Sequence, residues 1–380
     1  MSHRFALPIA ILLLAAFLIP SLLGNITVKG NVASNIAIQS DGTISYTSTM
    51  LLGVGHPAWA YDRNGNPVNI QALVNLVADS GANIWREAMY VSSTVPGYYA
   101  NLKSYCDQRG LKFMIQTVAA SVGAMTYQEE LDIIMNNNGQ QTPWINGWGS
   151  IIQQLQPYAI MVMNEPSNGG TYTTASATAF GYYRQFCINC INAWRQIKPD
   201  LVIIVGNDPF NDLFDSTSYG FAANPLPFSN IIYSRHIYYA YDGNYPPSYL
   251  PDQQAYWNAR TAQDLANAKQ LLTNLIDGES SALRNKGQQV MWDEMGANVN
   301  VPNALNYTQD FYDICKARNI GALYYDLVPV SYEPTGLLNE DYLTLNAMGQ
   351  VWAVEMSGGL ILLTNLATTK VLIYCYIFIN

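Results

Sequence analysis

Short apolar runs alternate with longer segments of helical periodicity along most of the chain. The apolar runs are rich in Val, Ile, Met and Tyr, which is typical of strands buried on both faces of a parallel sheet. We expect strands at residues 50–55, 83–89, 112–118, 158–163, 201–205, 230–237, 289–293 and 321–325. We expect helices at residues 70–80, 98–109, 144–156, 175–197, 254–285, 303–318 and 343–355. Eight such units in about 300 residues predict an α/β fold, the (β/α)8 TIM barrel.

The two ends of the chain depart from this alternation and suggest four parts. Residues 1–24 join a short basic start to an apolar run, which predicts a signal peptide or a retained signal anchor. Residues 25–49 are rich in Asn, Ser, Thr and Gly and predict an N-terminal hairpin or cap. The catalytic barrel is expected at 50–357, and 358–380 form an apolar C-terminal tail. We expect a secreted or extracellular protein, with membrane association through either apolar end as an alternative.

Composition narrows the classes of partner and cofactor. The net charge is −9, which argues against a nucleic-acid partner. The five Cys are an odd number and suggest no disulfide framework. Cys187 and Cys190 have CxxC spacing within a predicted helix, but no second pair and no His companions follow them. We therefore predict neither a metal site nor a cofactor.

Two apolar runs end in carboxylates, and these ends carry the candidate chemistry. Residues 158–163 lead directly into Asn164-Glu165-Pro166, and Pro166 must end the strand because it has no N–H to donate. Residues 289–292 lead in the same way into Asp293-Glu294. Cleavage of a glycosidic bond needs one protonated and one ionised carboxyl group, so Glu165 and Glu294 are the candidate pair.

Three further polar residues lie on predicted strands. Arg86 lies on a strand predicted to be buried and therefore needs a carboxylate partner. Glu87 and Asp62 are its ordinary candidates. His236 and Tyr238 are two positions apart near the end of a strand, so both should lie on the same face of the sheet.

This ordered set of residues resembles glycoside hydrolase family 5, the cellulase-like retaining glycosidases of clan A, over residues 45 to 356. The resemblance implies that Glu165 is the acid/base and Glu294 the nucleophile, supported by Arg86. It also implies that Asn164 donates to the sugar 2-hydroxyl. Asp293 is the rival nucleophile, but strand alternation should send these neighbouring residues to opposite faces, so that one of the two points into the site.

The same resemblance implies that His236 contacts the acid/base side and that the Tyr238 hydroxyl bonds the nucleophile. The chain also departs from the family pattern. Residues 113–118 contain no His, whereas the family usually has one near the end of strand three. The Trp of strand eight is replaced by Tyr324 or Tyr325, and we favour Tyr325.

Two aromatic residues near the first strand, His56 and Trp59, are candidates to supply the missing polar and stacking surface. The preferred hypothesis is a retaining endo-β-1,4-glucanase that acts on β-glucan by double displacement. A β-mannanase or another β-glycan hydrolase of the clan is one alternative. A non-catalytic carbohydrate-binding protein on a decayed barrel is the other.

Overall fold

The computed structural model describes most of the chain between residues 50 and 357. The described ranges are 50–56, 68–90, 95–118, 124–166, 177–206, 220–240, 250–328, 335–339, 341 and 343–357. For residue 56 and for the strand segments 36–38, 44–46, 360–364 and 371–375 the backbone alone is described. The chain divides into two compact units, Met1–Thr49 and Met50–Asn380.

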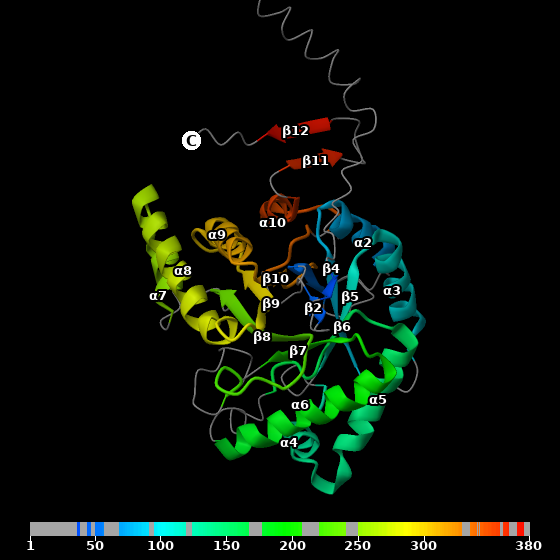
Figure 1. Ribbon diagram of the computed structural model, residues 1–380. Coiled ribbons are helices and arrows are strands. Elements are labelled where there is room, and N and C mark those ends of the chain that lie inside the picture. Colours follow the sequence, from blue (N-terminus) through cyan, green and yellow to red (C-terminus); the bar gives the residue numbers. More distant parts are fainter. Residues whose placement is uncertain are drawn as a thin grey trace, which may run out of the picture. The chain divides into compact units, whose positions relative to one another are not determined.

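Within the described part of the second unit, eight parallel strands close into a barrel (Figure 1). Their order around the barrel is β10-β3-β4-β5-β6-β7-β8-β9, so that neighbours in sequence are neighbours in the sheet. This arrangement confirms the predicted (β/α)8 barrel. The strands are β3 (Leu52–His56), β4 (Ile84–Met89), β5 (Lys112–Thr117), β6 (Ala159–Met161), β7 (Val202–Gly206), β8 (Ile231–Tyr239), β9 (Gln289–Ala297) and β10 (Gly321–Tyr324).

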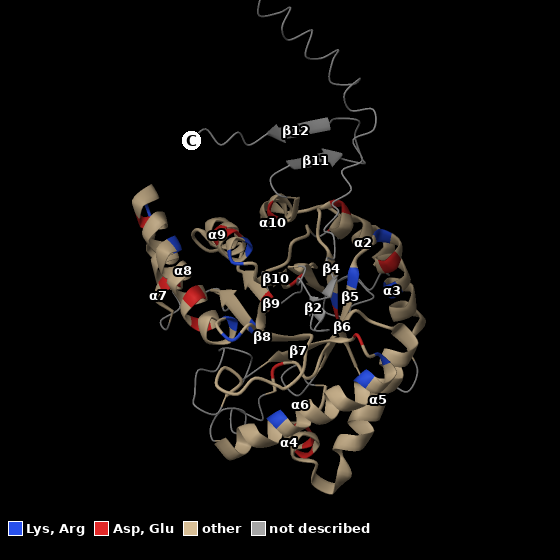
Figure 2. Ribbon diagram, in the orientation of Figure 1, with Lys and Arg blue, Asp and Glu red and all other residues tan. Residues whose placement is uncertain are grey.

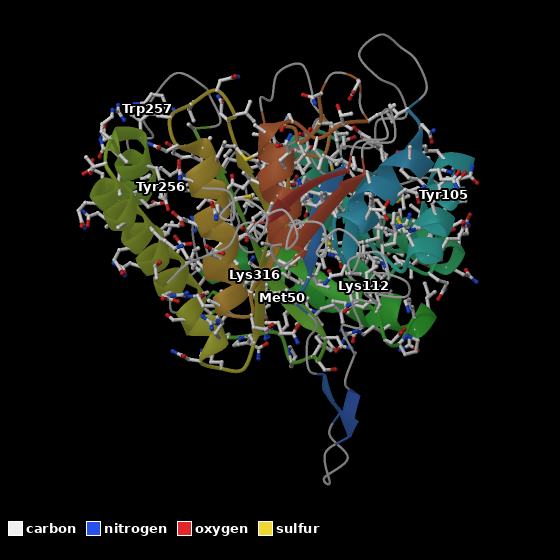
Figure 3. The ribbon with its side chains drawn as sticks, turned by 90° about the horizontal axis from the view of Figure 1, so that it is seen from above. Met50, Tyr105, Lys112, Tyr256, Trp257 and Lys316 are labelled. Atoms are coloured by element: carbon white, nitrogen blue, oxygen red, sulfur yellow. The ribbon has the colours of Figure 1, made fainter. Side chains whose placement is uncertain are left out.

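Helices between the strands surround the barrel, with α2 and α3 on one side and α8 and α9 on the other (Figure 1). Figure 3 shows Tyr256 and Trp257, which belong to α7, at the outer edge of this ring. The helices are α2 (Ile70–Asp79), α3 (Gly97–Arg109), α4 (Tyr127–Met135), α5 (Gln141–Leu155), α6 (Ala177–Ile197), α7 (Pro251–Asn258), α8 (Ala262–Arg284), α9 (Ala304–Ala317) and α10 (Ala347–Ser357), with the short 3-10 helix η2 (Asn137–Gly139).

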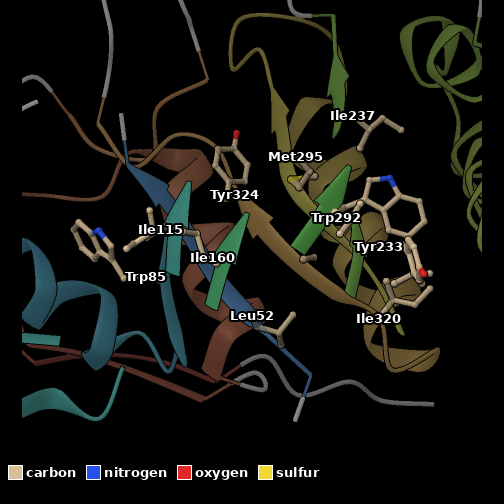
Figure 4. Packing of buried hydrophobic residues seen from close by; sticks show 14 of the residues in the cluster. Leu52, Trp85, Ile115, Ile160, Tyr233, Ile237, Trp292, Met295, Ile320 and Tyr324 are labelled. Carbon is tan, nitrogen blue, oxygen red and sulfur yellow. The ribbon is translucent and has the colours of Figure 1, made fainter. Parts of the chain in front are cut away.

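The main core lies between the outward faces of the strands and the helices. Trp85, Ile115, Ile160 and Trp292 are fully buried there (Figure 4). Each large apolar side chain contributes about 1.5–3 kcal/mol by leaving water. Helices cover the outer face of each strand, and the inner face lies inside the closed barrel. Both faces are therefore buried, so each strand is a continuous apolar run in the sequence.

A second buried cluster fills the barrel interior near the amino ends of the strands. Its members lie on the barrel strands, except Leu51, which directly precedes β3. Along the chain they alternate with members of the main core. They are Leu51, Ile84, Met114, Ala159, Met161, Val202, Ile204, Ile232, Met291 and Leu323. The interior is therefore packed at this end, as in other barrels of eight parallel strands.

Two helical segments differ from the sequence-based expectation. Helix α4 was not predicted, although Thr126 and Glu129 form a capping box at its start. The expected single helix over 254–285 is two helices, because the chain is extended at Ala259 and Thr261 begins α8 with a second capping box. These caps were the available signals, because the apolar periodicity alone does not show where one helix ends and the next begins.

The outer strands form two separate pairs. In the first unit, β1 (Ile36–Ile38) pairs antiparallel with β2 (Ile44–Tyr46), as expected for a hairpin in residues 25–49. In the second unit, β11 (Leu360–Thr364) pairs antiparallel with β12 (Val371–Cys375). No helix in the described ranges has both the length and the apolar content needed to cross a membrane. The predicted signal or anchor segment, residues 1–24, lies outside the described residues.

Charged residues are few on this fold, since Asp, Glu, Lys and Arg together make up 12% of the sequence. Figure 2 shows them scattered over helices such as α3 and α8, while most of the ribbon carries none. Against this background, a group of charged side chains inside the barrel is a distinct feature of the molecule.

Candidate active site

The carboxyl ends of four strands bring the predicted polar residues together inside the barrel. Arg86 lies on β4, His236 and Tyr238 lie on β8, and Glu294 lies on β9. Glu165 follows the end of β6. Because all strands are parallel, their carboxyl ends meet at the same end of the barrel, which is where such folds place their functional groups.

Glu294 is held by three donors. Arg86 Nη2 donates to its Oε1 at 2.5 Å, and Gln116 Nε2 donates to the same oxygen at 3.2 Å. The Tyr238 hydroxyl donates to Oε2. The Arg86 side chain is completely buried, and that of Glu294 is 6% exposed. A buried carboxylate with a guanidinium partner and two further donors is stabilised in its ionised form.

Glu165 has a different environment. Its Oε1 lies 2.6 Å from Nδ1 of His236, and its side chain is 17% exposed. Burial raises the pKa of the Glu165 carboxyl; His236 opposes the rise and the charge of Glu294 adds to it, with a net upward shift. Its backbone has a φ of 44°, a conformation uncommon for residues other than glycine. Glu165 is thus suited to hold a proton.

Glu165, His236 and Glu294 each present an atom within 4.8 Å of the others. Carboxylate and imidazole groups this close could hold a metal ion. However, protein donors already engage Glu294 through Arg86 and Tyr238, and the Nδ1 atom of His236 faces Glu165. These contacts suit two carboxyl groups with different roles, of which Glu165 exchanges protons, better than coordination of a cation.

The predicted alternation at Asp293 and Glu294 is wrong. Along β8 and β9, Arg235 pairs with Trp292 while His236 pairs with Glu294, so β9 contains one extra residue. The register against β10 shifts at the same place. This β-bulge lets Asp293 point into the barrel beside Glu294, because two residues of β9 face one residue of its neighbour.

Asp293 contacts both cationic groups of the site. Its Oδ2 lies 3.2 Å from Arg86 Nε, and its Oδ1 lies 3.3 Å from His236 Nε2. Burial raises the pKa of the Asp293 carboxyl, but the positive charges of His236 and Arg86 outweigh it, and the net shift is downward. Asp293 is therefore an ionised carboxylate inside the barrel.

His236 faces three carboxylates. Burial lowers the pKa of its imidazole, but the charges of Glu294 and Asp293 and the contacts with Asp293 and Glu165 raise the pKa to about 10. Its Nε2 faces Asp293 and its Nδ1 faces Glu165, so both ring nitrogens have an acceptor. A protonated imidazole satisfies both contacts as a donor.

Asn164 and Tyr325 complete the predicted set that the structure brings together. Asn164 Oδ1 accepts from Arg86 Nη2 at 3.1 Å. The Tyr325 ring lies 5.9 Å from the Arg86 guanidinium and 6.4 Å from the Tyr238 ring. Tyr324 instead lies in the main core and bonds Ala297, so of the two tyrosines it is Tyr325 that borders the site.

Two residues of the site were missed by the sequence analysis. Gln116 occupies the end of β5, where a His was sought and not found, and its signal was a lone amide in an apolar strand. Gly55 on β3 packs against Tyr325 and Arg86; a Cβ there would lie 2.8 Å from the Tyr325 ring and 3.3 Å from Arg86 Nη1. The His56 side chain and Trp59 lie outside the described residues.

The fold has many relatives of known structure. Endoglucanase Cel5A from Thermotoga maritima matches with a TM-score of 0.57 at 11% identity, over 80% of this chain and 96% of that one. A hyperthermostable endocellulase matches with a TM-score of 0.61 at 12% identity, over 83% and 94%. Endo-glycoceramidase II from Rhodococcus sp. matches with a TM-score of 0.58 at 16% identity, over 83% and 80%. At such identities the likeness concerns the fold.

Sequence comparison is more specific about the family. None of the curated proteins is similar enough in sequence to count as a match. In contrast, residues 44–331 match the family Cellulase (glycosyl hydrolase family 5), a span that includes β3 to β10 and every side chain of the site. With this match and the closed barrel, the chain belongs to the cellulase family, glycosyl hydrolase family 5.

Proposed function

We propose that this glycoside hydrolase is a retaining endo-β-1,4-glucanase that cleaves β-glucan by double displacement. The observation that carries the proposal is the pair Glu165 and Glu294, which present oxygen atoms within 4.8 Å of each other. Retaining enzymes hold their two carboxyl groups about 5–5.5 Å apart, whereas inverting enzymes need about 6.5–9.5 Å to admit a water.

In the first step, Glu294 attacks the anomeric carbon as the glycosidic bond breaks. Glu165 gives its proton to the leaving oxygen, which departs as a sugar hydroxyl, and Glu294 becomes esterified to the remaining sugar. Arg86, Gln116 and Tyr238 keep Glu294 ionised and oriented before the attack. Glu165, with its raised pKa, is the group able to carry the proton.

In the second step, water replaces the enzyme at the anomeric carbon. Glu165, now a carboxylate, takes a proton from this water, and Glu294 leaves as a carboxylate. The contact from His236 helps Glu165 to bear its negative charge in this step. Arg86 orients Asn164 by donating to its amide oxygen. The amide nitrogen of Asn164 is then the donor that we assign to the sugar 2-hydroxyl.

The preference for β-1,4-glucan is drawn from similar proteins of known structure. Thermotoga maritima Cel5A has been seen with cellobiose, and it has also been seen with mannotriose. A β-mannanase is therefore the second candidate. We expect the side chains of Tyr325 and Gln116 to decide between glucan and mannan. The family pattern has Trp and His at these two positions.

Export is part of the proposal and depends on residues 1–24. N-terminal sequencing of the protein recovered from its host would show whether this segment is removed. If the segment is retained, the need for detergent to extract the full chain would test membrane anchoring. Recovery of uncleaved protein inside the cell, extracted without detergent, would contradict export.

The test of activity is release of reducing sugar from carboxymethylcellulose, barley β-glucan and mannan by the full chain. We expect activity on the glucans and its loss in Glu165→Gln and in Glu294→Gln. Activity on mannan alone would support the proposed mechanism but would identify mannan, rather than β-glucan, as the substrate. A folded parent that released nothing from any β-glycan would contradict the proposal and favour a carbohydrate-binding role.

A further inference from the structure

Asp293 is a buried charge that the reaction described above does not use. Its side chain is completely buried, as is that of Arg86, and that of His236 is 1% exposed. Burying an ionised carboxylate is costly unless cationic partners compensate it. Asp293 has two such partners, and the β-bulge in β9 is what turns it toward them.

Each partner of Asp293 also contacts carboxyl groups of the proposed reaction: Arg86 contacts Glu294, and His236 contacts both Glu165 and Glu294. Arg86 contacts Asp293 through Nε and Glu294 through Nη2. His236 contacts Asp293 through Nε2 and Glu165 through Nδ1. These four contacts connect Glu165 to Glu294 through Asp293, in addition to the direct contact of His236 Nδ1 with Glu294 Oε2 at 3.3 Å. A change at Asp293 therefore reaches both carboxyl groups.

We propose that Asp293 is a positioning residue that fixes the His236 imidazole with Nδ1 as a donor to Glu165 and fixes the Arg86 guanidinium with Nη2 as a donor to Glu294. The inference rests on the proposed function of Glu165 and Glu294, and it adds a third carboxylate that does not touch the sugar. A neutral imidazole can donate from only one nitrogen, so a donor at Nδ1 and a contact between Nε2 and a carboxylate together require a protonated ring.

The charges of the cluster balance when one of its three carboxyl groups holds a proton, and Glu165, whose pKa is raised, is the group suited to hold it. Asp293, Glu294 and Glu165 can contribute three negative charges, against two positive charges on Arg86 and His236. With all carboxylates ionised the buried cluster carries one net negative charge, and with Glu165 protonated it carries none. Net charge inside a protein is costly, so Asp293 favours the proton on Glu165 that the first step consumes.

The groups that face His236 limit which residues can set its charge. They are Glu165 beyond β6 and the two carboxylates of β9, and Tyr238 on β8 itself bonds Glu294. Strand β7, the other neighbour of β8, is Val202–Gly206 and carries no titratable side chain. Asp293 is a charge on the Nε2 side of the ring, 3.3 Å from that nitrogen.

The first test needs no substrate. The chain has three histidines, His3, His56 and His236, so the imidazole resonances of ¹⁵N-histidine-labelled full chain can be assigned with a His236→Gln variant. We expect His236 in the parent to remain protonated on both nitrogens as pH rises well past about 6.5, the ordinary value. In Asp293→Asn we expect its titration to move down by at least about one pH unit, because one of its negative neighbours is lost.

Asp252→Asn is the matched control. Asp252 is a buried aspartate on α7, near Tyr239 and Tyr307 rather than in the barrel interior. The same chemical change there should leave the His236 titration unaltered. If Asp293→Asn does not fold, the measurement on the parent still tests the proposal. A parent His236 whose imidazole titrates near its ordinary pKa, with Nε2 unprotonated above that pH, would overturn the proposal.

The second test measures the reaction. In Asp293→Asn we expect kcat to fall roughly 100-fold, as for other displacements of a reacting group, with a KM within about threefold of the parent. We also expect the fall in activity at high pH to begin at lower pH than in the parent. Unchanged kcat, pH profile and His236 titration in folded Asp293→Asn would overturn the inference. Inactivity of the parent on every β-glycan would instead overturn the proposed function, with the imidazole titration still testing Asp293.

Discussion

The barrel interior has two layers of side chains with opposite chemistry. Near the amino ends of the strands it holds a cluster of apolar groups that includes Ile84 and Met114. Two positions further along the same strands, Ile84 is followed by Arg86 and Met114 by Gln116. The strand geometry is the same in both layers, because residues two apart face the same side.

The difference shows how one barrel separates stability from chemistry. The apolar layer gains free energy by leaving water and needs no specific partner. The charged layer must be compensated group by group, and Arg86 alone contacts Glu294, Asp293 and Asn164. Substitutions in the two layers should therefore have different effects, and the following predictions test that difference.

The largest effect is expected for Glu294→Gln. The amide cannot attack the anomeric carbon, so kcat should fall by more than about 10⁴-fold, and the unfolding free energy should also fall because buried Arg86 loses a charged partner. Steady-state kinetics and denaturant unfolding measure both. Glu87→Gln, on the outward face of β4, should keep the kcat of the folded protein. A Glu294→Gln enzyme with substantial residual activity would point to Asp293 as the nucleophile.

Glu165→Gln should reduce kcat by about 10²–10⁴-fold on polysaccharide, the usual contribution of a general acid. Aryl glycosides with good leaving groups should lose less in the first step, because their departure needs less protonation. In the parent, activity should fall as pH rises through the raised pKa of Glu165, and this fall should be absent from the variant. Equal losses for good and poor leaving groups would contradict the acid role.

In the apolar layer, Leu323→Ala should destabilise the fold by about 2–5 kcal/mol, because it leaves a cavity in a fully buried site. The kcat of the protein that remains folded should be unchanged. Urea unfolding and activity per folded molecule give the two quantities. A large fall in kcat without loss of stability would show that the two layers are not separate.

Gln116→Leu removes one donor to Glu294 but leaves Arg86 and Tyr238 in place. A hydrogen bond to a charged group contributes about 1.5–3 kcal/mol, so kcat/KM should fall roughly 10- to 100-fold. Gln116→His supplies a ring N–H and should recover part of this loss. If both variants match the parent, Gln116 does not take part in orienting Glu294.

The stability of the fold should also depend on pH through His236. The pKa of His236 is near 10 in the folded protein and about 6.5 in an unfolded chain, so its contribution is fully present below 6.5 and is lost as pH rises toward 10. The unfolding free energy should fall in that range by up to about 1.4 kcal/mol per pH unit. His236→Gln should show a weaker slope in denaturant unfolding at several pH values. A parent with stability independent of pH over this range would contradict the charged state of His236.

Much of the barrel could be predicted from sequence because its strands are long apolar runs with polar residues at their ends. The same rule located Glu165, Glu294, Arg86, His236 and Tyr238, and the structure brings them together. Residues whose orientation depends on irregular backbone geometry were harder to predict. The inward position of Asp293 follows from a bulge, and a bulge leaves no period of its own in the sequence.

Gln116 and Gly55 were missed for another reason. An amide in an apolar strand and a glycine near a strand end are both compatible with ordinary packing, and only their neighbours give them a role. Apolar periodicity does not reveal the break between α7 and α8. The capping box of Thr261 and Asp264 marks it in the sequence.

The bulge in β9 also bears on how such a site could arise. Met291 and Glu294 face the interior, whereas Trp292 and Met295 pack in the main core, so Asp293 is the residue beyond regular alternation. Insertion of one codon could add this carboxylate without turning Glu294 or any later residue of the strand to the opposite face. Deletion of the same codon would remove one charge and leave Glu294 facing the interior, so the third carboxylate is geometrically separable from Glu165 and Glu294.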